Sequence, residues 1–187
     1  MTVGDLEAMP KTTAREGSSR ACIDSTRLSR SLRLSGIVEE SIVDGPGIRY
    51  AVFTQGCPHR CPGCHNPQTH DLEGGYEISS ADLIESFMRS AAENPLLSGV
   101  TITGGEPLIQ AYGLIPFADA ARAAGYDIWI YTGYTMEEIT KRHDGDEMAL
   151  LKLTDTLVDG RFTQELRTLE KRFIGSSNQR IISSPFR

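Results

Sequence analysis

Residues 56–67 read Gly-Cys-Pro-His-Arg-Cys-Pro-Gly-Cys-His-Asn-Pro and hold three of the four cysteines, Cys57, Cys61 and Cys64. The spacing is C-x3-C-x2-C, so the three side chains are confined to one short loop. Thiolates this close together either share a metal or repel one another. The prolines and Gly63 suit a loop that wraps tightly around a metal centre. The segment therefore predicts a metal or cluster site.

The spacing by itself leaves two kinds of metal site open. A structural zinc ion needs four ligands. The fourth would have to come from one of four residues: His59, His65, His70 or Cys22. A four-iron cluster normally takes four cysteines, so three would leave one iron open to a substrate. A disulfide framework is not expected, because the cysteines are crowded and residues 1–20 lack the apolar core of a secretory signal.

Composition narrows the class of protein further. The chain has 187 residues, of which 39% are hydrophobic and 24% charged, as expected of one globular domain. The net charge of −6 argues against binding nucleic acid through charge. No apolar run approaches the roughly 18 residues that a membrane helix needs. We therefore expect a cytoplasmic protein with neither nucleic acid nor membrane as a partner.

The chain divides into two parts by composition. Residues 1–35 are rich in Ser, Thr and Arg and contain few large apolar residues. They predict a disordered or loosely attached N-terminal extension. Residues 36–187 predict a single folded domain.

Within that domain, short apolar strands alternate with helical patterns. Strands are expected at 48–53, 100–103, 128–131 and 156–158, and helices at 79–93, at about 114–124 and after Thr135. This order is typical of βαβ units and a parallel sheet, hence of an α/β fold. Each strand ends in an unusual loop: residues 56–67, Gly-Gly-Glu-Pro at 104–107, Thr-Gly-Tyr at 132–134 and Asp-Gly-Arg-Phe at 159–162. Carboxyl ends of parallel strands share one rim, so these loops should meet in one pocket.

The motifs are recognisable as a set. A C-x3-C-x2-C loop after a strand resembles the radical S-adenosylmethionine (SAM) superfamily. Residues 44–49, Asp-Gly-Pro-Gly-Ile-Arg, and 64–67, Cys-His-Asn-Pro, resemble the activases of glycyl-radical enzymes. Residues 157–162 and 175–180 are similar to the activating proteins of anaerobic ribonucleoside-triphosphate reductases. The resemblance covers the chain from about residue 37 to 182.

The resemblance implies a fold, cofactors and partners. The fold would be an incomplete parallel (β/α) barrel of the radical SAM type. Cys57, Cys61 and Cys64 would ligate one [4Fe-4S] cluster, whose open iron binds the amino and carboxylate groups of SAM. A flavodoxin-like or ferredoxin-like donor would reduce the cluster. The oxidoreductase would then place a glycyl radical on a partner enzyme, the large subunit of anaerobic ribonucleotide reductase, with no side chain acting as acid or base.

The resemblance also implies SAM contacts, at Gly63, Cys64, His65, Gly104, Gly105, Glu106 and Thr132. Gly104, Gly105 and Glu106 would bind the amino group, because glycines let a ligand approach the backbone. The main chain around Cys64 would lie against the adenine. An ordinary turn at 104–107 and strand-end packing by Tyr131 and Tyr134 remain alternative interpretations of these motifs. His65 is expected beside the ligands rather than among them.

Other residues and other functions stay open. Trp129 is expected in the core, and Arg49 with Asp44 either forms an ion pair or positions a partner. Three rival functions are an activase of another glycyl-radical enzyme, a small radical SAM enzyme acting on a peptide or small molecule, and a zinc-stabilised binding module without catalysis. Only the last would bind zinc in place of a cluster.

Overall fold

The computed structural model describes residues 29–186. These residues form one seven-stranded sheet in the order β3-β1-β2-β4-β5-β6-β7. The strands are β1 (Ser31–Ser41), β2 (Ile48–Thr54), β3 (Tyr76–Ser79), β4 (Leu97–Gly104), β5 (Asp127–Tyr131), β6 (Thr156–Asp159) and β7 (Arg180–Ser183). The helices are α2 (Ser80–Glu93), α3 (Ala111–Ala123), α4 (Met136–Arg142) and α5 (Gly145–Leu153), with 3-10 turns η1 (Pro67–Thr69), η2 (Pro107–Gln110) and η3 (Gln164–Leu166).

The centre of the sheet is parallel and its margins are antiparallel. Strands β2, β4, β5 and β6 pair in parallel, which confirms the expected α/β class. Strands β1, β3 and β7 pair antiparallel with their neighbours, so the sheet is mixed rather than wholly parallel. Within residues 29–186, no helix combines the length and the apolarity needed to cross a bilayer.

Strand β1 corrects the predicted domain boundary. It begins at Ser31, so residues 31–35 belong to the sheet and not to an extension. Leu32 and Leu34 alternate with Arg33, and both leucines are fully buried in the core. This period of two is typical of a strand with one buried face. The polar residues around the two leucines obscured the pattern in the sequence. The rest of the expected extension, including Cys22, lies outside the described residues.

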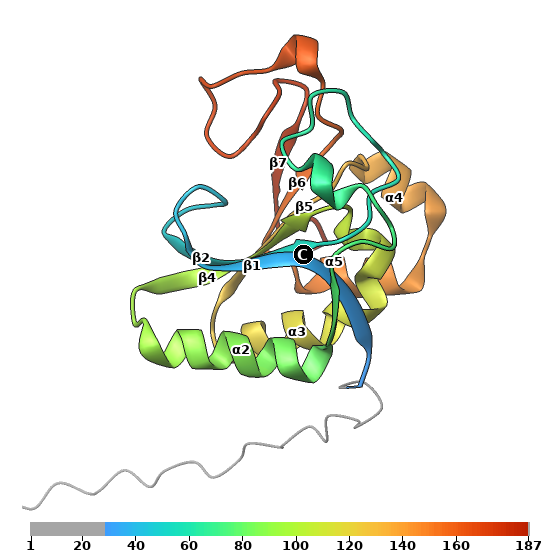
Figure 1. Cartoon of the computed structure of the whole chain (residues 1–187). Helices are drawn as coiled ribbons and strands as arrows, with labels where there is room; N and C mark the ends of the chain where they lie inside the picture. The colour runs from blue at the N-terminus through green and yellow to red at the C-terminus, as the bar shows by residue number, and fades with distance from the viewer. Residues whose placement is uncertain (1–28, 187) are drawn as a thin grey trace, which may run out of the picture.

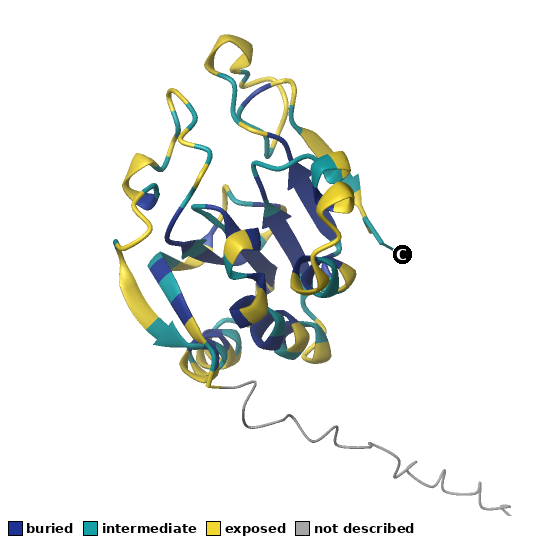
Figure 2. Ribbon diagram, turned by 90° about the vertical axis from the view of Figure 1, so that its right-hand side faces the viewer, coloured by how far each residue is buried: buried dark blue, intermediate teal, exposed yellow. Residues whose placement is uncertain are grey.

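Helices α2, α3 and α5 bury their apolar sides against one face of the sheet. Phe87 of α2 and Phe117 of α3 are fully buried and meet edge to face, with ring centroids 5.7 Å apart. Figure 1 shows α2 and α3 below the sheet, whereas the loops after β2 and β6 stand on its other side. In Figure 2 the central strands are buried, and exposed residues lie on the loops and outer helix surfaces. The core therefore leaves the carboxyl ends of the strands free for a site.

Capping residues in the sequence correctly predicted where two of the helices begin. The side chain of Ser79 accepts a hydrogen bond from the Asp82 N–H at the start of α2. Thr135 and Glu138 form a full capping box at the start of α4. Helix α5 was not predicted. It begins only three residues after α4 ends, at Gly145, and Asp144 caps it. A glycine in its first turn weakened the helical pattern.

Candidate functional site

The cysteine loop leaves the carboxyl end of β2 and is closed at its base. The Gly56 N–H donates to the Thr69 carbonyl at 2.9 Å. The side chain of Gln55 donates to the carbonyls of Gln68 and Asp71, at 3.1 and 2.7 Å. Within the loop, Arg60 takes a left-handed conformation with φ of 46°. Such a conformation is uncommon for a residue other than glycine, so the surrounding contacts must hold the loop in its shape.

Backbone N–H groups surround the three sulfur atoms. The Asn66 N–H donates to Cys64 Sγ at 3.4 Å. Main-chain donors of His59 and Arg60 face Cys57, and the Phe162 main chain faces Cys61. Burial raises the pKa of the Cys57 and Cys61 thiols, and the neighbouring charge of Cys64 raises that of Cys61 further. Thiols in such a setting stay protonated until a metal displaces the proton, and N–H donors then stabilise the bound sulfur.

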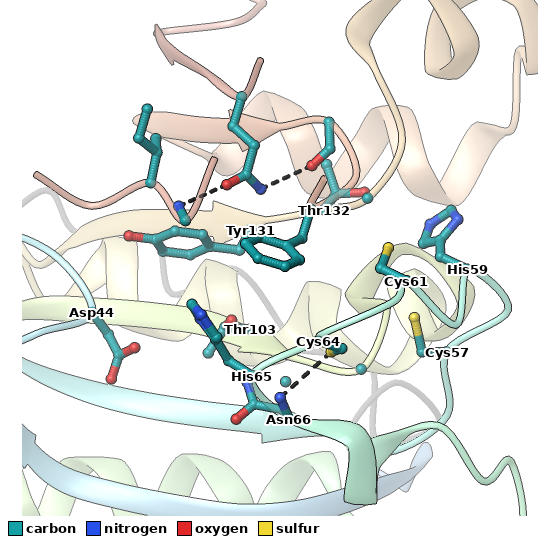
Figure 3. A pocket seen from close by; sticks show the side chains of 18 of the residues that line it. Asp44, Cys57, His59, Cys61, Cys64, His65, Asn66, Thr103, Tyr131 and Thr132 are labelled. Carbon is teal, nitrogen blue, oxygen red and sulfur yellow. Dashed lines mark hydrogen bonds between the residues drawn. The ribbon is translucent and has the colours of Figure 1, made fainter. Parts of the chain in front are cut away.

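The cysteines open into a cavity of about 500 Å³ at the carboxyl ends of β2, β4, β5 and β6 (Figure 3). Its wall combines residues from all four predicted loops. Seven of the nine predicted site residues line it: Cys57, Cys61, Cys64, His65, Gly104, Gly105 and Thr132. In Figure 3 Cys57 and Cys61 lie at one end and Asp44 at the other. The expected convergence of four distant loops is therefore present in the structure.

Glu106 lies behind this wall and is not on it. Its side chain is fully buried, and its two oxygens accept four hydrogen bonds. Oε1 accepts from the Leu108 N–H and the Thr132 hydroxyl, and Oε2 from the Gly133 N–H and His59 Nε2. These four donors occupy the carboxylate, which lies behind the residues that line the cavity.

Gly63 also lies off the cavity wall. A side chain there would meet Gln164 of η3, since an added Cβ would lie 2.7 Å from Gln164 Oε1. Its φ of 69° and this close approach explain the glycine. Gly63 thus packs the cysteine loop against the C-terminal segment, whereas its neighbours Cys64 and His65 reach the cavity.

Arg49 and Asp44 do not pair with each other through their side chains. The Arg49 guanidinium is fully buried and donates to Asp127 Oδ1 at 2.6 Å. Its Nε donates to the Thr101 hydroxyl, which donates in turn to the Asp44 carbonyl at 2.8 Å. Arg49 therefore fixes the loop that carries Asp44 to the cavity, and Trp129 is buried as expected.

Several lining residues were missed from sequence. Leu169, Phe173 and Ile174 reach the cavity from the segment between η3 and β7. They belong to no strand or helix and to none of the recognised motifs, so no local signal pointed to them. His70 also lines the cavity, and its Nε2 is buried with no hydrogen-bond partner among the described residues. A buried polar atom of this kind indicates a place where a bound group would complete the site.

The donor set suits an iron–sulfur cluster. Three thiols share one cavity, each faced by a main-chain N–H donor, and thiolates with such donors are the usual ligands of iron–sulfur clusters. Over residues 29–186, no group of three His, Cys, Asp or Glu side chains is arranged to hold a single metal ion. Each cysteine of a four-iron cluster binds a different iron atom, so the three thiols need not converge on one point. The residues present therefore fit the cluster that the resemblance implied.

The sheet and its thiol-lined cavity define an α/β protein with a cofactor site. The family model of the 4Fe-4S single cluster domain matches residues 43–182. The anaerobic ribonucleoside-triphosphate reductase-activating protein of Escherichia coli (strain K12) is 33% identical over 143 residues, covering 74% of this chain and 90% of that protein. The proteins of the same name from phage T4 and Vibrio cholerae are 33% and 32% identical, and the matches cover 76% and 74% of this chain and 88% and 89% of theirs.

The chain therefore belongs to the 4Fe-4S single cluster domain family, with these activating proteins as its relatives. This confirms the resemblance to glycyl-radical activases and the single [4Fe-4S] cluster that the motifs predicted. Among solved structures, QueE from Escherichia coli aligns with a TM-score of 0.45 at 24% identity, over 56% of this chain and 54% of that one.

Proposed function

We propose that this protein cleaves SAM reductively at a [4Fe-4S] cluster and generates a glycyl radical on an anaerobic ribonucleoside-triphosphate reductase. One observation carries the proposal: the three-cysteine loop and the glycine-rich loops after β4, β5 and β6 meet in a single cavity. The names of its relatives supply the partner.

In this proposal Cys57, Cys61 and Cys64 ligate three irons of the cluster. The glycine backbone of Gly104 and Gly105 leaves room for SAM to approach the main chain. Thr132 and His65 extend the same wall and would contact SAM beside the cluster. Glu106 and Gly63 support the wall from behind, as their contacts suggest.

When bound, the cluster and SAM supply the chemistry, an electron and a carbon-centred radical that removes a hydrogen atom from the partner's glycine. The residues of this chain bind, orient and shield. Phe162 and Phe173 contribute apolar surface to the same cavity and would limit the access of water to it. No side chain in the cavity is required to move a proton.

The rim of the cavity suits a partner's main-chain segment. Val43 and Leu169 line it, yet their side chains are 73% and 89% exposed. Exposed apolar residues at a site entrance typically mark a surface that another molecule covers. A glycine-bearing loop of the reductase would bury them as it enters.

Three finer points belong to the same proposal. The four parallel strands joined by helices would form part of an incomplete (β/α) barrel, as the shared rim supports. A flavodoxin-like or ferredoxin-like protein would deliver the electron. The protein would act in the cytoplasm, where its cysteines stay reduced.

The test is anaerobic reconstitution with iron and sulfide, reduction, and an assay for 5′-deoxyadenosine and methionine. Both products are expected, and Cys61→Ala should abolish them whereas the matched variant Cys22→Ala keeps them. Retained cleavage in Cys61→Ala would overturn the ligand assignment. A colourless zinc protein would point instead to a binding module without catalysis.

The partner is tested separately by titrating the loaded protein with candidate glycyl-radical enzymes. A glycyl radical detected by electron paramagnetic resonance on the anaerobic reductase, and not on others, is expected. Radical formation only on a different enzyme would reassign the partner, and turnover of a small molecule without any glycyl radical would reject activase function.

A further inference from the structure

His59 stands between two cluster cysteines, and its side chain makes its contacts with residues of other loops. Its side chain is only 5% exposed, and Nε2 lies 2.9 Å from Glu106 Oε2. Arg161 Nε lies 3.1 Å from His59 Nδ1. A guanidinium can only donate, so Nδ1 is the acceptor and Nε2 carries the proton that is donated to Glu106. Both ring nitrogens are therefore occupied by neighbours from other loops.

The neighbours of the ring fix its orientation as well. Tyr134 meets the His59 ring edge to face, with centroids 4.4 Å apart. Arg142 lies over the Tyr134 ring, with Cζ 3.6 Å from its centroid. Gly133 lies against the imidazole so closely that an added Cβ would come within 2.3 Å of His59 Cδ2. The ring thus fills a slot that leaves no room for a different position.

This slot joins loops that are distant in sequence. Glu106 follows β4, Thr132 and Gly133 follow β5, and Arg161 follows β6. Glu106 accepts from Thr132 Oγ1 at 2.8 Å and from the Gly133 N–H at 2.8 Å, and Arg161 continues to Glu138 of α4 at 3.2 Å. The segment between Cys57 and Cys61 is thereby attached, through one histidine, to the ends of three other strands.

We propose that Glu106 and His59 are positioning residues, which hold the segment from Cys57 to Cys61 in its ligand geometry before the cluster binds. The inference rests on the proposed cluster ligands. A buried carboxylate that receives four donors cannot turn toward a ligand without leaving those donors unpaired in the interior. Glu106 therefore acts on the cluster through His59, and the binding of SAM falls to the main chain of its neighbours.

Pre-organisation of this kind is measurable as cluster retention. A loop that is already held in place loses little conformational entropy when it binds iron, whereas a released loop loses more at that moment. Removing a partner that orients a metal ligand typically weakens binding by about 10- to 100-fold. The effect should appear in the absence of SAM.

The experiment uses the reconstituted full chain and measures the rate of iron loss to a chelator without SAM. Unfolding of the apoprotein and SAM affinity, read from the spectrum of the reduced cluster, are measured alongside. His59→Ala and Glu106→Gln should lose iron about 10- to 100-fold faster. Gly133→Ala, which pushes the ring out of its slot without removing either partner, should act in the same direction.

Two further variants separate positioning from general stability. His59→Gln keeps one donor and one acceptor at similar reach, so it should restore most of the retention. Ser80→Ala removes a fully buried hydroxyl that donates to the Gly113 and Arg30 carbonyls, away from the cavity, and should leave iron loss unchanged. Equal acceleration in Ser80→Ala would show a merely structural effect and overturn the inference.

A second outcome would also overturn it. If Glu106→Gln retains iron like the unaltered protein but binds SAM more weakly, Glu106 is a contact of SAM. The proposed function fails under different results, namely a reconstituted protein that forms no cluster or that releases neither 5′-deoxyadenosine nor methionine. The two failures are therefore distinguishable.

Discussion

The helix-covered face of the sheet and the loops at the carboxyl ends of its strands are held by different forces. On the helix-covered face, Phe87 and Phe117 are fully buried and pack in the core with apolar residues of α2, α3 and α5. At the carboxyl ends, the loops are held by the hydrogen bond between His59 and Glu106 and by that from Gln55 to the Gln68 carbonyl. Close contacts at glycines add to these. The first region is stabilised by burial in proportion to area, and the second by directional contacts.

The difference explains how the protein separates stability from function. An apolar core tolerates small adjustments of shape, because its attraction has no direction. A cofactor site needs its ligands in fixed positions, and hydrogen bonds to buried groups hold them there. Losing one such bond leaves a buried polar group unpaired, which costs free energy. Variants in the two regions should therefore fail in different ways.

The largest effect on stability is expected from the core. Phe117→Ala removes a fully buried ring that contacts Phe87 and Tyr50. The free energy of unfolding should fall by about 3–5 kcal/mol. Urea denaturation of the apoprotein measures it, and Met88→Ala on the exposed side of α2 is the control, with a change within about 0.5 kcal/mol. A loss below about 1 kcal/mol for Phe117→Ala would contradict the assignment of this face as the main source of stability.

The next effect concerns the loops and is measured as a rate of SAM cleavage. Gly105→Ala would place a Cβ 2.3 Å from the Gly56 carbonyl oxygen, at the root of the cysteine loop. Because a displacement of about 1 Å can cost about a hundredfold in rate, SAM cleavage should fall by that order. Gly36→Ala has no atom within 4 Å of the new Cβ and serves as the control. Cleavage by Gly105→Ala at the unaltered rate would show that the two loops do not depend on their close contact.

A smaller change should stabilise the helix-covered region alone. Gly145 begins α5, has open space where an added Cβ would lie and has no left-handed φ. Gly145→Ala should raise the free energy of unfolding by about 0.4–1 kcal/mol, since it restricts the unfolded chain. Thermal unfolding measures this, and SAM cleavage should not change. Gly125→Ala, at a φ of 88°, should instead destabilise.

The smallest effect is a pH dependence at the edge of the sheet. Arg180 of β7 donates two hydrogen bonds to the exposed Glu137 of α4 and lowers the pKa of that carboxyl from 4.5 to about 2. A depressed carboxyl pKa stabilises the fold above pH 4.5, and this contribution is lost as the pH falls from 4.5 towards 2. Glu137→Gln should therefore melt slightly below the unaltered protein at pH 7, and the two should converge near pH 2. A difference in melting temperature between the two proteins that grows as the pH falls would contradict this prediction.

Much of the fold could be predicted because its signals are local. The β-branched strands, the cap at Ser79 and the capping box at Thr135 lie within a few residues of the elements they define. Strands β1 and β7 were not predicted. Strand β1 shows a period of two only at Leu32 and Leu34, and β7 has just four residues, so both gain their place by pairing with β2 and β6. Such pairing between segments distant in sequence is not visible in a short local pattern.

The sequence by itself determined the cysteine spacing, the glycine-rich loops and the order of strands that brings them to one rim. Only the tertiary structure decided which groups surround Glu106. Its partner His59 lies 47 residues away, and Arg161 lies 102 residues from His59. A carboxylate in a motif can face a ligand or support a loop, and the choice depends on which donors surround it after folding. Burial and hydrogen-bond partners are properties of the assembled loops, so no local pattern could have distinguished the two roles.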